Sequence, residues 1–308
     1  MKQYTIRKPV QCSGIGLHGG RKVELALRPA DEDSGIVFYL HGRDGTRMLE
    51  PTPESVIGTG LATTLGNEHG SVSTVEHLLA AIRGLGIDNL HIDVHGGEIP
   101  IMDGSAASFV FLIRSAGLRA QGAPKRSLRV KKSFSFCNDG KKVEVEPFEG
   151  FRVDYDINFA HPLIGDQSMR FDLTPDLFVR RLAKARTFGF LKDVEMLQKN
   201  GLALGGSLDN AVVLDEYGVV NEGGLRYKDE FVRHKVLDFI GDMAVAPLPL
   251  LGHFKVSCSG HAFNNQFLRE LIALKESHLE VVEAPASEAA GEAEPDTGED
   301  IVGIPAMA

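Results

Sequence analysis

The order of strand-like and helix-like segments is the feature that most restricts the fold of this chain. In the first half, alternating apolar and polar residues predict strands at 22–27, 36–40 and 90–94, and helical spacing predicts helices at 73–84 and 105–116. The connections have hairpin length and show no regular βαβ alternation. This order predicts a sheet with helices on one face, which is an α+β arrangement.

The second half repeats that order of elements without a clear repeat of sequence. Its expected elements are strands at 128–136, 142–146, 152–159, 210–214 and 253–258, and helices at 174–185, 228–243 and 264–276. The polar stretch 119–126 contains Gly and Pro and is expected to be the junction. We therefore predict an α+β protein with two domains, 1–120 and 127–279, each a mainly antiparallel sheet with helices on one face.

The acidic charge of the chain is concentrated at its end. The formal net charge is −9, and the eight acidic residues from Glu280 onward account for all but −1 of it. The body is nearly neutral, which argues against nucleic acid binding through a broad basic face. The segment 283–300 lacks aromatic residues and is rich in Ala, Glu, Pro and Gly, so we expect 280–308 to be an acidic disordered tail.

The cysteines and the apolar segments indicate the compartment. Cys12, Cys137 and Cys258 are odd in number and widely spaced, which fits a reducing environment and excludes a cysteine-based metal site. The first residues have no apolar signal-peptide core, and no apolar run approaches the roughly 20 residues that span a bilayer. We expect a cytoplasmic protein without stable membrane insertion.

Residues 233–243, RHKVLDFIGDM, place polar side chains along one side of a predicted helix. His234, Asp238 and Asp242 recur every four residues, and Lys235 lies beside them. At about 100° per residue these side chains share one arc of the helix. Two interpretations are open: a solvated polar face, which is the common meaning of this pattern, or a row of ligands.

A second candidate is the Glu76-His77 pair in STVEHLLAA (73–81). Ser73 and Glu76 fit a capping box, in which Glu76 would bond a backbone N–H at the helix start. Alternatively, His77, His234 and Asp238 form a set of two imidazoles and one carboxylate, the composition of catalytic zinc sites. Glu76 would then be free to take a proton from water at the metal. The HExxH pattern of common metalloproteases is absent.

Five motifs carry a resemblance to a known family. They are, in order, STVEHLLAA, IPIMDGSAASF (99–109), ARTFGF (185–190), HKVLDFIGD (234–242) and SGHAFNN (259–265). The sequence resembles the UDP-3-O-acyl-N-acetylglucosamine deacetylases, zinc amidases of lipid A biosynthesis in Gram-negative bacteria, from about residue 4 to 275. The resemblance implies helices sandwiched between two sheets, with the zinc site at the junction of the domains.

The resemblance also implies an activity and its residues. The reaction is the zinc-dependent hydrolysis of the N-acetyl group of UDP-3-O-(3-hydroxyacyl)-N-acetylglucosamine, which releases acetate and commits the substrate to lipid A. The partner is thus a small-molecule substrate, an acylated UDP-sugar. The implied roles are zinc ligands for His77, His234 and Asp238, general base for Glu76, general acid for His261, orientation of His261 for Asp242, oxyanion stabilisation for Thr187 and substrate contact for Lys235.

The substrate's acyl chain requires an apolar passage. The candidates are Phe190, Leu191, Val194 and Leu197, followed by the small residues Ala203, Gly205 and Gly206 of GLALGGS (201–207). By resemblance, Phe159 and Phe188 flank the sugar and the acyl group. Ordinary core packing is the alternative, because sequence alone cannot distinguish a lined passage from a filled core.

Cys258 is a departure from the family, whose members carry Lys or Arg before the SGH motif. A thiol cannot neutralise the pyrophosphate as a cation does. Two competing functions follow from the residues: a zinc amidase for another N-acylated sugar, or a non-catalytic protein that binds a nucleotide sugar or a metal.

Overall fold

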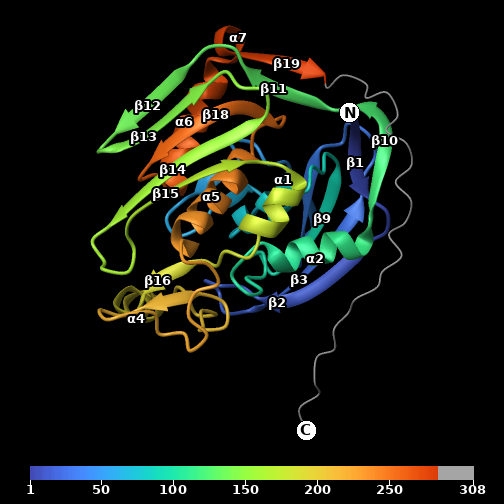
Figure 1. The fold of residues 1–308 in the computed structure, drawn as a ribbon. Coiled ribbons are helices and arrows are strands. Elements are labelled where there is room, and N and C mark those ends of the chain that lie inside the picture. The colour runs from blue at the N-terminus through green and yellow to red at the C-terminus, as the bar shows by residue number, and fades with distance from the viewer. Residues whose placement is uncertain (284–308) are drawn as a thin grey trace, which may run out of the picture.

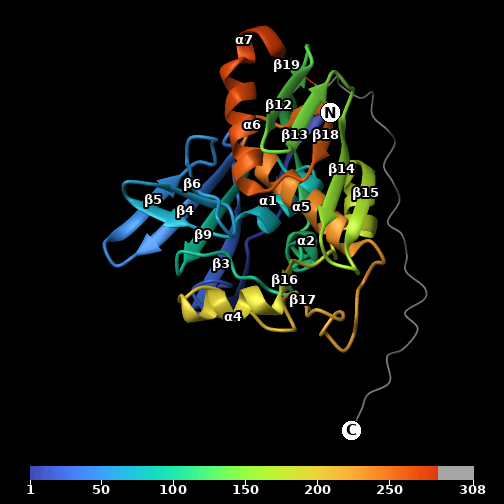
Figure 2. The same cartoon turned by 90° about the vertical axis from the view of Figure 1, so that its left-hand side faces the viewer.

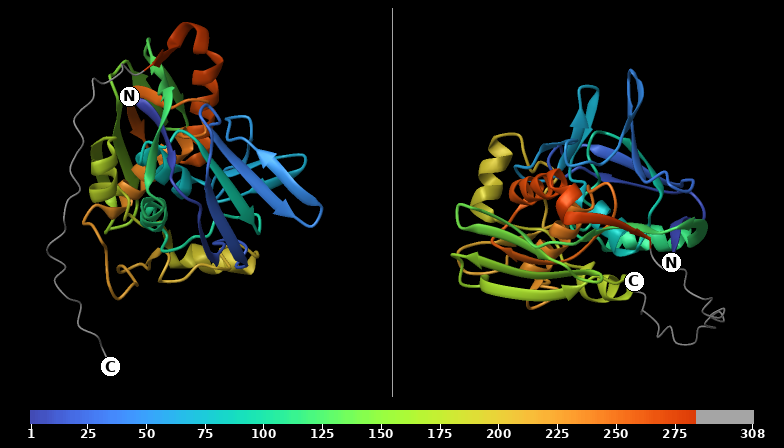
Figure 3. Two further views of the ribbon diagram at one scale, coloured as in Figure 1. Left: turned by 90° about the vertical axis from the view of Figure 1, so that its right-hand side faces the viewer. Right: turned by 90° about the horizontal axis from the view of Figure 1, so that it is seen from above.

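Two sheets with helices between them form the body of the protein, as seen in Figure 1 and from above in Figure 3. The computed structural model describes residues 1–283. The predicted α+β class is confirmed. The predicted acidic segment lies outside the described residues from 284 on. The division into domains 1–120 and 127–279 stays a prediction.

The first sheet is five-stranded and has the order β2-β3-β9-β4-β5. Its strands are β2 (Val10–Ile15), β3 (Lys22–Pro29), β4 (Ile36–Gly42), β5 (Gly45–Leu49) and β9 (Leu90–His95). Only the β4–β9 pair is parallel in this sheet. Alternation explains its burial: Leu25, Leu27, Ile92 and Val94 are buried, whereas Glu24 and His95 face outward.

The second sheet is seven-stranded and is built around one central strand. Its strands are β11 (Arg126–Val130), β12 (Phe134–Asn138), β13 (Lys141–Glu146), β14 (Phe151–Phe159), β15 (Gly165–Asp172), β18 (Leu250–Ser257) and β19 (Leu279–Glu283). The central strand β18 pairs with β13 and β11 along one edge and with β14 along the other.

Shorter elements complete the described chain. The strands are β1 (Lys2–Ile6), β6 (Val56–Gly58), β7 (Thr64–Asn67), β8 (Gly70–Val72), β10 (Leu118–Pro124), β16 (Phe188–Phe190) and β17 (Val212–Leu214). The helices are α1 (Glu76–Gly84), α2 (Ala107–Ala116), α3 (Pro175–Leu177), the π-helix η1 (Phe178–Leu182), α4 (Leu191–Lys199), α5 (Glu230–Met243), α6 (His261–Ala273) and α7 (Lys275–His278). Figure 2 shows α4 at the end of the first sheet, near β3.

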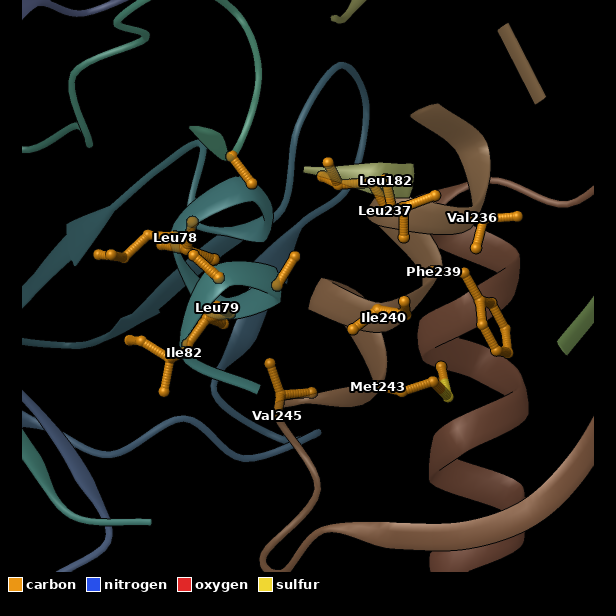
Figure 4. Close-up of a cluster of buried hydrophobic side chains, with 14 of the residues drawn as sticks. Leu78, Leu79, Ile82, Leu182, Val236, Leu237, Phe239, Ile240, Met243 and Val245 are labelled. Carbon is orange, nitrogen blue, oxygen red and sulfur yellow. The ribbon is translucent and has the colours of Figure 1, made fainter. Parts of the chain in front are cut away.

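Helices α1 and α5 pack against each other between the two sheets. Their apolar side chains form one buried cluster, in which Leu78, Leu79 and Ile82 of α1 lie opposite the Leu237 and Ile240 side of α5 (Figure 4). Gly241 allows the close approach, because a Cβ atom at this position would lie 2.1 Å from the Glu76 carbonyl oxygen. The first turn of α1 therefore lies directly against the last turn of α5.

Several expected boundaries are wrong. Residues 119–124 of the expected junction belong to β10 (Leu118–Pro124), which pairs with β1 at the N-terminus. The expected strand 128–136 is two strands, broken at 131–133. The expected helix 174–185 is the short α3 followed by the π-turn η1. Residues 280–283, expected in the tail, pair with β11 as part of β19.

None of the helices within residues 1–283 combines the length and the hydrophobicity that a membrane-spanning segment requires.

Candidate metal centre and active site

His77 of α1 and His234 and Asp238 of α5 converge at the contact between the two helices. One ligand atom from each of the three residues lies within 4.8 Å of the others. Asp238 Oδ1 is 3.2 Å from His234 Nε2 and 3.6 Å from His77 Nε2. All three side chains are buried. The structure thus brings together the three residues that the sequence analysis expected as ligands, and the group could hold a metal ion.

The ring of His234 is oriented with its Nε2 atom toward the group. Its Nδ1–H donates a hydrogen bond to the Ala185 carbonyl, 3.1 Å away. Burial lowers the pKa of His234 to about 3, and the charges of His77 and Lys235 act in the same direction, against Asp238. The imidazole is therefore neutral and presents the Nε2 lone pair, which is the form that binds metals.

Asp238 has one oxygen engaged and one free. Its Oδ2 accepts a hydrogen bond from Lys235 Nζ at 2.7 Å. Its Oδ1 is buried and has no hydrogen-bond partner among the described residues. Burial acts to raise the pKa of Asp238, but the neighbouring His234 and Lys235 outweigh it and hold this pKa well below its usual range. An ionised oxygen without a partner is costly in a protein interior unless a cation compensates it.

Glu76 is the first residue of α1 and is buried beside this group. The capping-box alternative is wrong, because Val75 is the N-cap and no side chain caps the helix. The Glu76 carboxylate instead accepts a hydrogen bond from Thr63 N at 3.0 Å. Burial raises the pKa of Glu76, and the positive charge of His261 partly offsets the rise. Its Oε1 lies 4.0 Å from His261 Nε2.

His261 begins α6 and is oriented by Asp242. The His261 Nδ1 atom lies 2.9 Å from Asp242 Oδ2, and the same carboxylate accepts hydrogen bonds from Thr63 Oγ1 at 2.6 Å and Asn264 Nδ2 at 2.8 Å. Burial acts to lower the pKa of His261, but the charge and the hydrogen bond of Asp242 outweigh it and raise this pKa to about 10. His261 is therefore an imidazolium at neutral pH, with its Nε2 side toward Glu76.

Aromatic side chains border the His77–His234–Asp238 group, which is called the metal group below, on one side. Phe188 has its ring centroid 6.3 Å from that of His234, and Lys235 Nζ lies 5.6 Å from the Phe188 centroid. The rings of Phe159 and Phe188 are 5.7 Å apart, and Phe159 and Phe190 are 6.4 Å apart. The expected aromatic residues thus form one cluster beside the expected ligands.

Thr187 lies on the segment that carries Ala185 and is fixed by its backbone. Its N–H donates to the Gly104 carbonyl at 2.8 Å, and its own carbonyl accepts from Val212 N at 2.8 Å. Gly104 has a φ of 78°, and a Cβ atom there would lie 2.0 Å from the Asn210 carbonyl oxygen. This position therefore requires glycine for both its conformation and its space.

Arg186 and Glu230 anchor the same segment to the start of α5. Arg186 Nε lies 2.9 Å from Glu230 Oε1, and both side chains are buried. The same carboxylate oxygen accepts the Arg186 N–H at 3.0 Å. This paired charge connects residues 185–188 to the helix that carries His234 and Asp238.

Of the expected passage residues, Phe190 ends β16, and the others lie on and after α4. Leu191 and Val194 belong to α4, which buries none of its side chains. Val194 lies close to Gly189, since a Cβ atom at Gly189 would be 3.8 Å from Val194 Cγ2. The expected small-residue loop packs on the β2–β3 turn, where Gly205 N donates to the Leu17 carbonyl at 2.9 Å. A Cβ atom at Gly206 would lie 3.8 Å from the Leu17 side chain.

Apolar side chains remain exposed along this region. They are Ile15, Leu191, Met196, Leu202, Leu204 and Leu208. Ala203 is buried and has a φ of 52°, in the left-handed region. The helix and loop therefore present an apolar surface next to the aromatic cluster instead of a closed core.

Sequence reasoning missed three residues that support the site. Thr63 bonds both Glu76 and Asp242, Asn264 bonds Asp242, and the Ala185 carbonyl orients His234. Asn264 was detectable, since it follows His261 by three residues on one helix and faces the same side. Thr63 and Ala185 carry no such signal, because their contacts depend on the tertiary fold.

Comparison with known proteins identifies the family of the chain. A family profile described as UDP-3-O-acyl N-acetylglycosamine deacetylase matches residues 3–273. Proteins named UDP-3-O-acyl-N-acetylglucosamine deacetylase are similar to the chain: that of Oleidesulfovibrio alaskensis is 60% identical, covering 92% of this chain and 93% of the relative. That of Nitratidesulfovibrio vulgaris is 58% identical over 94% and 93%, and that of Haemophilus influenzae is 48% identical over 90% and 92%. The chain therefore belongs to the UDP-3-O-acyl N-acetylglycosamine deacetylase family.

Proposed function

We propose that this protein hydrolyses the N-acetyl group of UDP-3-O-(3-hydroxyacyl)-N-acetylglucosamine, releases acetate and so commits the substrate to lipid A and lipopolysaccharide biosynthesis. The observation that carries the proposal is the position of Glu76. This buried carboxylate lies next to the His77–His234–Asp238 group and 4.0 Å from the imidazole of His261. Amide hydrolysis by a metal enzyme requires a base and an acid close to the metal site.

We propose zinc as the metal. Two imidazole nitrogens and one carboxylate oxygen are a typical catalytic zinc donor set, in which water takes the fourth position. The unpartnered Oδ1 of Asp238 and the neutral His234 support a cation at this place. When bound, zinc acts as a Lewis acid and lowers the pKa of coordinated water to about 7.

Glu76 and His261 divide the proton transfers between them. The raised pKa of Glu76, caused by burial, suits a general base that takes the proton of the attacking water. The C–N bond then breaks, and the sugar amine needs a proton. His261 can supply this proton because Asp242 keeps it charged at neutral pH, with its pKa raised to about 10. Acetate and the free amine are the products.

Lys235 and Thr187 complete the polar side of the proposed site. One N–H of Lys235 is used by Asp238, so its other N–H bonds can contact the substrate. Thr187 is two residues from Ala185, whose carbonyl bonds His234, and its backbone is held at both ends. We assign it the stabilisation of the oxyanion, a contribution of a few kcal/mol in comparable enzymes.

The acyl chain is proposed to lie along α4 and the loop after it. Phe159, Phe188 and Phe190 begin this path beside the metal group, and Leu191, Val194, Ala203 and Gly206 continue it. The exposed apolar side chains of the same region support the assignment, because an alkyl chain would cover them.

The cytoplasm is the proposed site of action. Cys12, Cys137 and Cys258 are free thiols, which suits a reducing compartment. Cys258 has a φ of 53°, and its N–H donates to the Asp156 carbonyl at 2.9 Å.

Acetate release from the acylated UDP-sugar tests the proposal. We expect turnover by the purified protein, its loss after a chelator and its return on addition of zinc. UDP-N-acetylglucosamine without the acyl chain should react far more slowly, which separates this activity from that of an amidase for other N-acylated sugars. Turnover that persists unchanged in the chelator would contradict the proposed metal role.

A further inference from the structure

A cavity lies between the two halves of the chain, at the ends of α1 and α5 that point away from the His77–His234–Asp238 group. Its volume is about 360 Å³, within the usual range for small-molecule sites. The apolar lining includes Leu79, Ile82 and Ile87 from the first half and Ala246 and Leu248 from the second. Figure 4 shows Ile82 and Val245 at this end of the two helices.

Arg83 is the charged side chain in this cavity whose guanidinium, in the described part of the chain, has unused hydrogen-bond donors and no opposite charge paired with it. It belongs to the last turn of α1, is partly buried and lines the cavity. Its Nη2 donates to the Leu250 carbonyl at 3.2 Å. Within residues 1–283, its side chain makes no other hydrogen bond and has no carboxylate within 4.0 Å. Burial lowers the pKa of Arg83 to about 10, and the charge of Asp88 opposes this shift.

The other charged groups of the cavity are already neutralised or exposed. Asp88 accepts from Lys125 Nζ at 2.6 Å and from Tyr4 N at 2.8 Å. Arg126 pairs with Asp33 at 2.8 Å. Glu50 lines the cavity but is solvent-exposed. Among the described residues that line the cavity, the guanidinium of Arg83 is thus the partly buried charge without an opposite partner.

The neutral polar side chains of the lining are hydrogen-bonded within the protein. Asn89 Nδ2 donates to Gln3 Oε1 and Gln121 Oε1, and its Oδ1 accepts the Gly35 N–H. Ser34 Oγ donates to the Asp31 carbonyl, and Thr52 exchanges two hydrogen bonds with Ser55. These side chains already have partners in the protein, so Arg83 is the partly buried charged donor with N–H groups left for a ligand.

We propose that this cavity binds a compact apolar molecule that carries one carboxylate, with Arg83 as its anion-binding residue. A guanidinium pairs with a carboxylate through two parallel N–H···O bonds, and Arg83 has N–H groups to spare. Asp33, Glu50 and Asp88 would repel a doubly charged phosphate more strongly than a singly charged carboxylate. The apolar walls provide the remaining binding free energy.

The cavity is separate from the metal group. Arg83 follows Glu76 by seven residues on α1, which is a rise of about 10 Å along the helix. None of the residues assigned to zinc, to proton transfer or to the acyl path lines the cavity. Binding there does not depend on the deacetylase activity, so each proposal can fail without the other.

Isothermal titration of the zinc-loaded full chain with 2-naphthoate tests this site, because the naphthalene ring is apolar and compact. We expect saturable binding of one molecule per chain. The neutral analogue 2-naphthamide should bind at least tenfold more weakly, since it lacks the charge that pairs with Arg83.

Two variants assign the binding to the cavity. Arg83→Gln should weaken 2-naphthoate at least tenfold, and Ala246→Leu, which fills the cavity without touching the cation, should weaken both compounds. Leu191→Glu, in the proposed acyl path, should leave the affinity unchanged. Unfolding temperature and zinc content serve as controls for folding of each variant.

The proposal is overturned if 2-naphthoate shows no saturable binding, or if Ala246→Leu binds it as tightly as the unmodified chain. Loss of binding in Leu191→Glu alone would also overturn it, since the probe would then occupy the acyl path.

Discussion

A buried carboxylate at a helix start is usually a cap, but Glu76 does not cap α1, which leaves it available for the proposed role of base. Its carboxylate bonds Thr63 N instead of the backbone of its own helix. That bond leaves Oε1 directed toward His261. The neighbouring residue His77 then turns to the other side, toward Asp238. Two adjacent side chains thus face two different groups, Glu76 toward His261 and His77 toward Asp238.

Glu76→Gln should separate metal binding from chemistry. The amide keeps the shape of the side chain and cannot accept a proton from water. We expect the deacetylation rate to fall by a factor of about 10² to 10⁴, the usual contribution of a general base. Zinc content, measured on the same preparation, should be unchanged. A rate close to that of the unmodified chain would remove Glu76 from the mechanism.

Asp242→Asn should change the pH dependence of turnover. Asp242 raises the pKa of His261 to about 10, so the proton donor is present at neutral pH and is lost only as the pH rises through that value. Without the negative charge this pKa falls, and the alkaline limb of the pH–rate profile should move to lower pH. Profiles of both proteins from pH 6 to 10 measure the shift. An unmoved alkaline limb would mean that His261 is not the donor.

At this scale the sequence predicted the residue types of the centre but not its supports. Spacing on one helix related His234 to Asp238, and their pairing with His77 came from the known chemistry of zinc donors. Thr63 could not be found in this way, since it bonds Glu76 and Asp242 from a loop that shares no periodicity with them. The roles of all these side chains stay predictions until variants are measured.

The contact between α1 and α5 is the element-scale feature on which the site depends. Glu76 and His77 reach the ligands of α5 only because the two backbones approach at Gly241. A larger residue there would clash with the main-chain carbonyl of Glu76, which cannot move aside as a flexible side chain can. The helix pair is therefore sensitive to one methyl group at this position.

Gly241→Ala should destabilise the protein despite better helix propensity. Alanine favours a helix by up to ~1 kcal/mol over glycine, whereas forced overpacking costs about 1–3 kcal/mol. We expect a net loss in the free energy of unfolding, with weaker zinc binding because the helices separate. Gly223→Ala is the matched control, since a Cβ there meets nothing within 4 Å. Equal stability of the two variants, by denaturant unfolding, would show that the close approach is not important.

Element prediction succeeded where periodicity was strong and failed where tertiary pairing decides. The helix expected at 228–243 is α5 (Glu230–Met243), because its polar and apolar faces are distinct. The stretch expected as a junction is instead β10, since pairing with β1 satisfies its backbone groups. The short α4 was not expected, although its apolar residues have helical spacing, and it buries none of its side chains.

At the scale of the whole molecule, the metal group joins the two halves of the chain. His77 comes from the first half, and His234 and Asp238 come from the second. A cation held by all three should therefore stabilise the whole described body and not one sheet alone. The order of strands and helices predicted two sheets, whereas the helices between the sheets were expected only from the family resemblance.

Zinc should raise the unfolding temperature of the metal-free protein. A ligand that binds only the folded state, at a hundred times its Kd, adds about 2.7 kcal/mol to the free energy of unfolding. Calorimetry with and without zinc measures this, and His77→Ala should show little of the increase. An equal increase in His77→Ala would place the stabilising ion elsewhere.

The central claim is that α1 and α5 supply three ligands to one zinc ion, and metal stoichiometry tests it most directly. Elemental analysis should find about one zinc ion per unmodified chain, as expected for a single three-ligand site, and much less in His77→Ala and in Asp238→Ala, each shown to be folded. Full zinc occupancy in both variants would contradict the account.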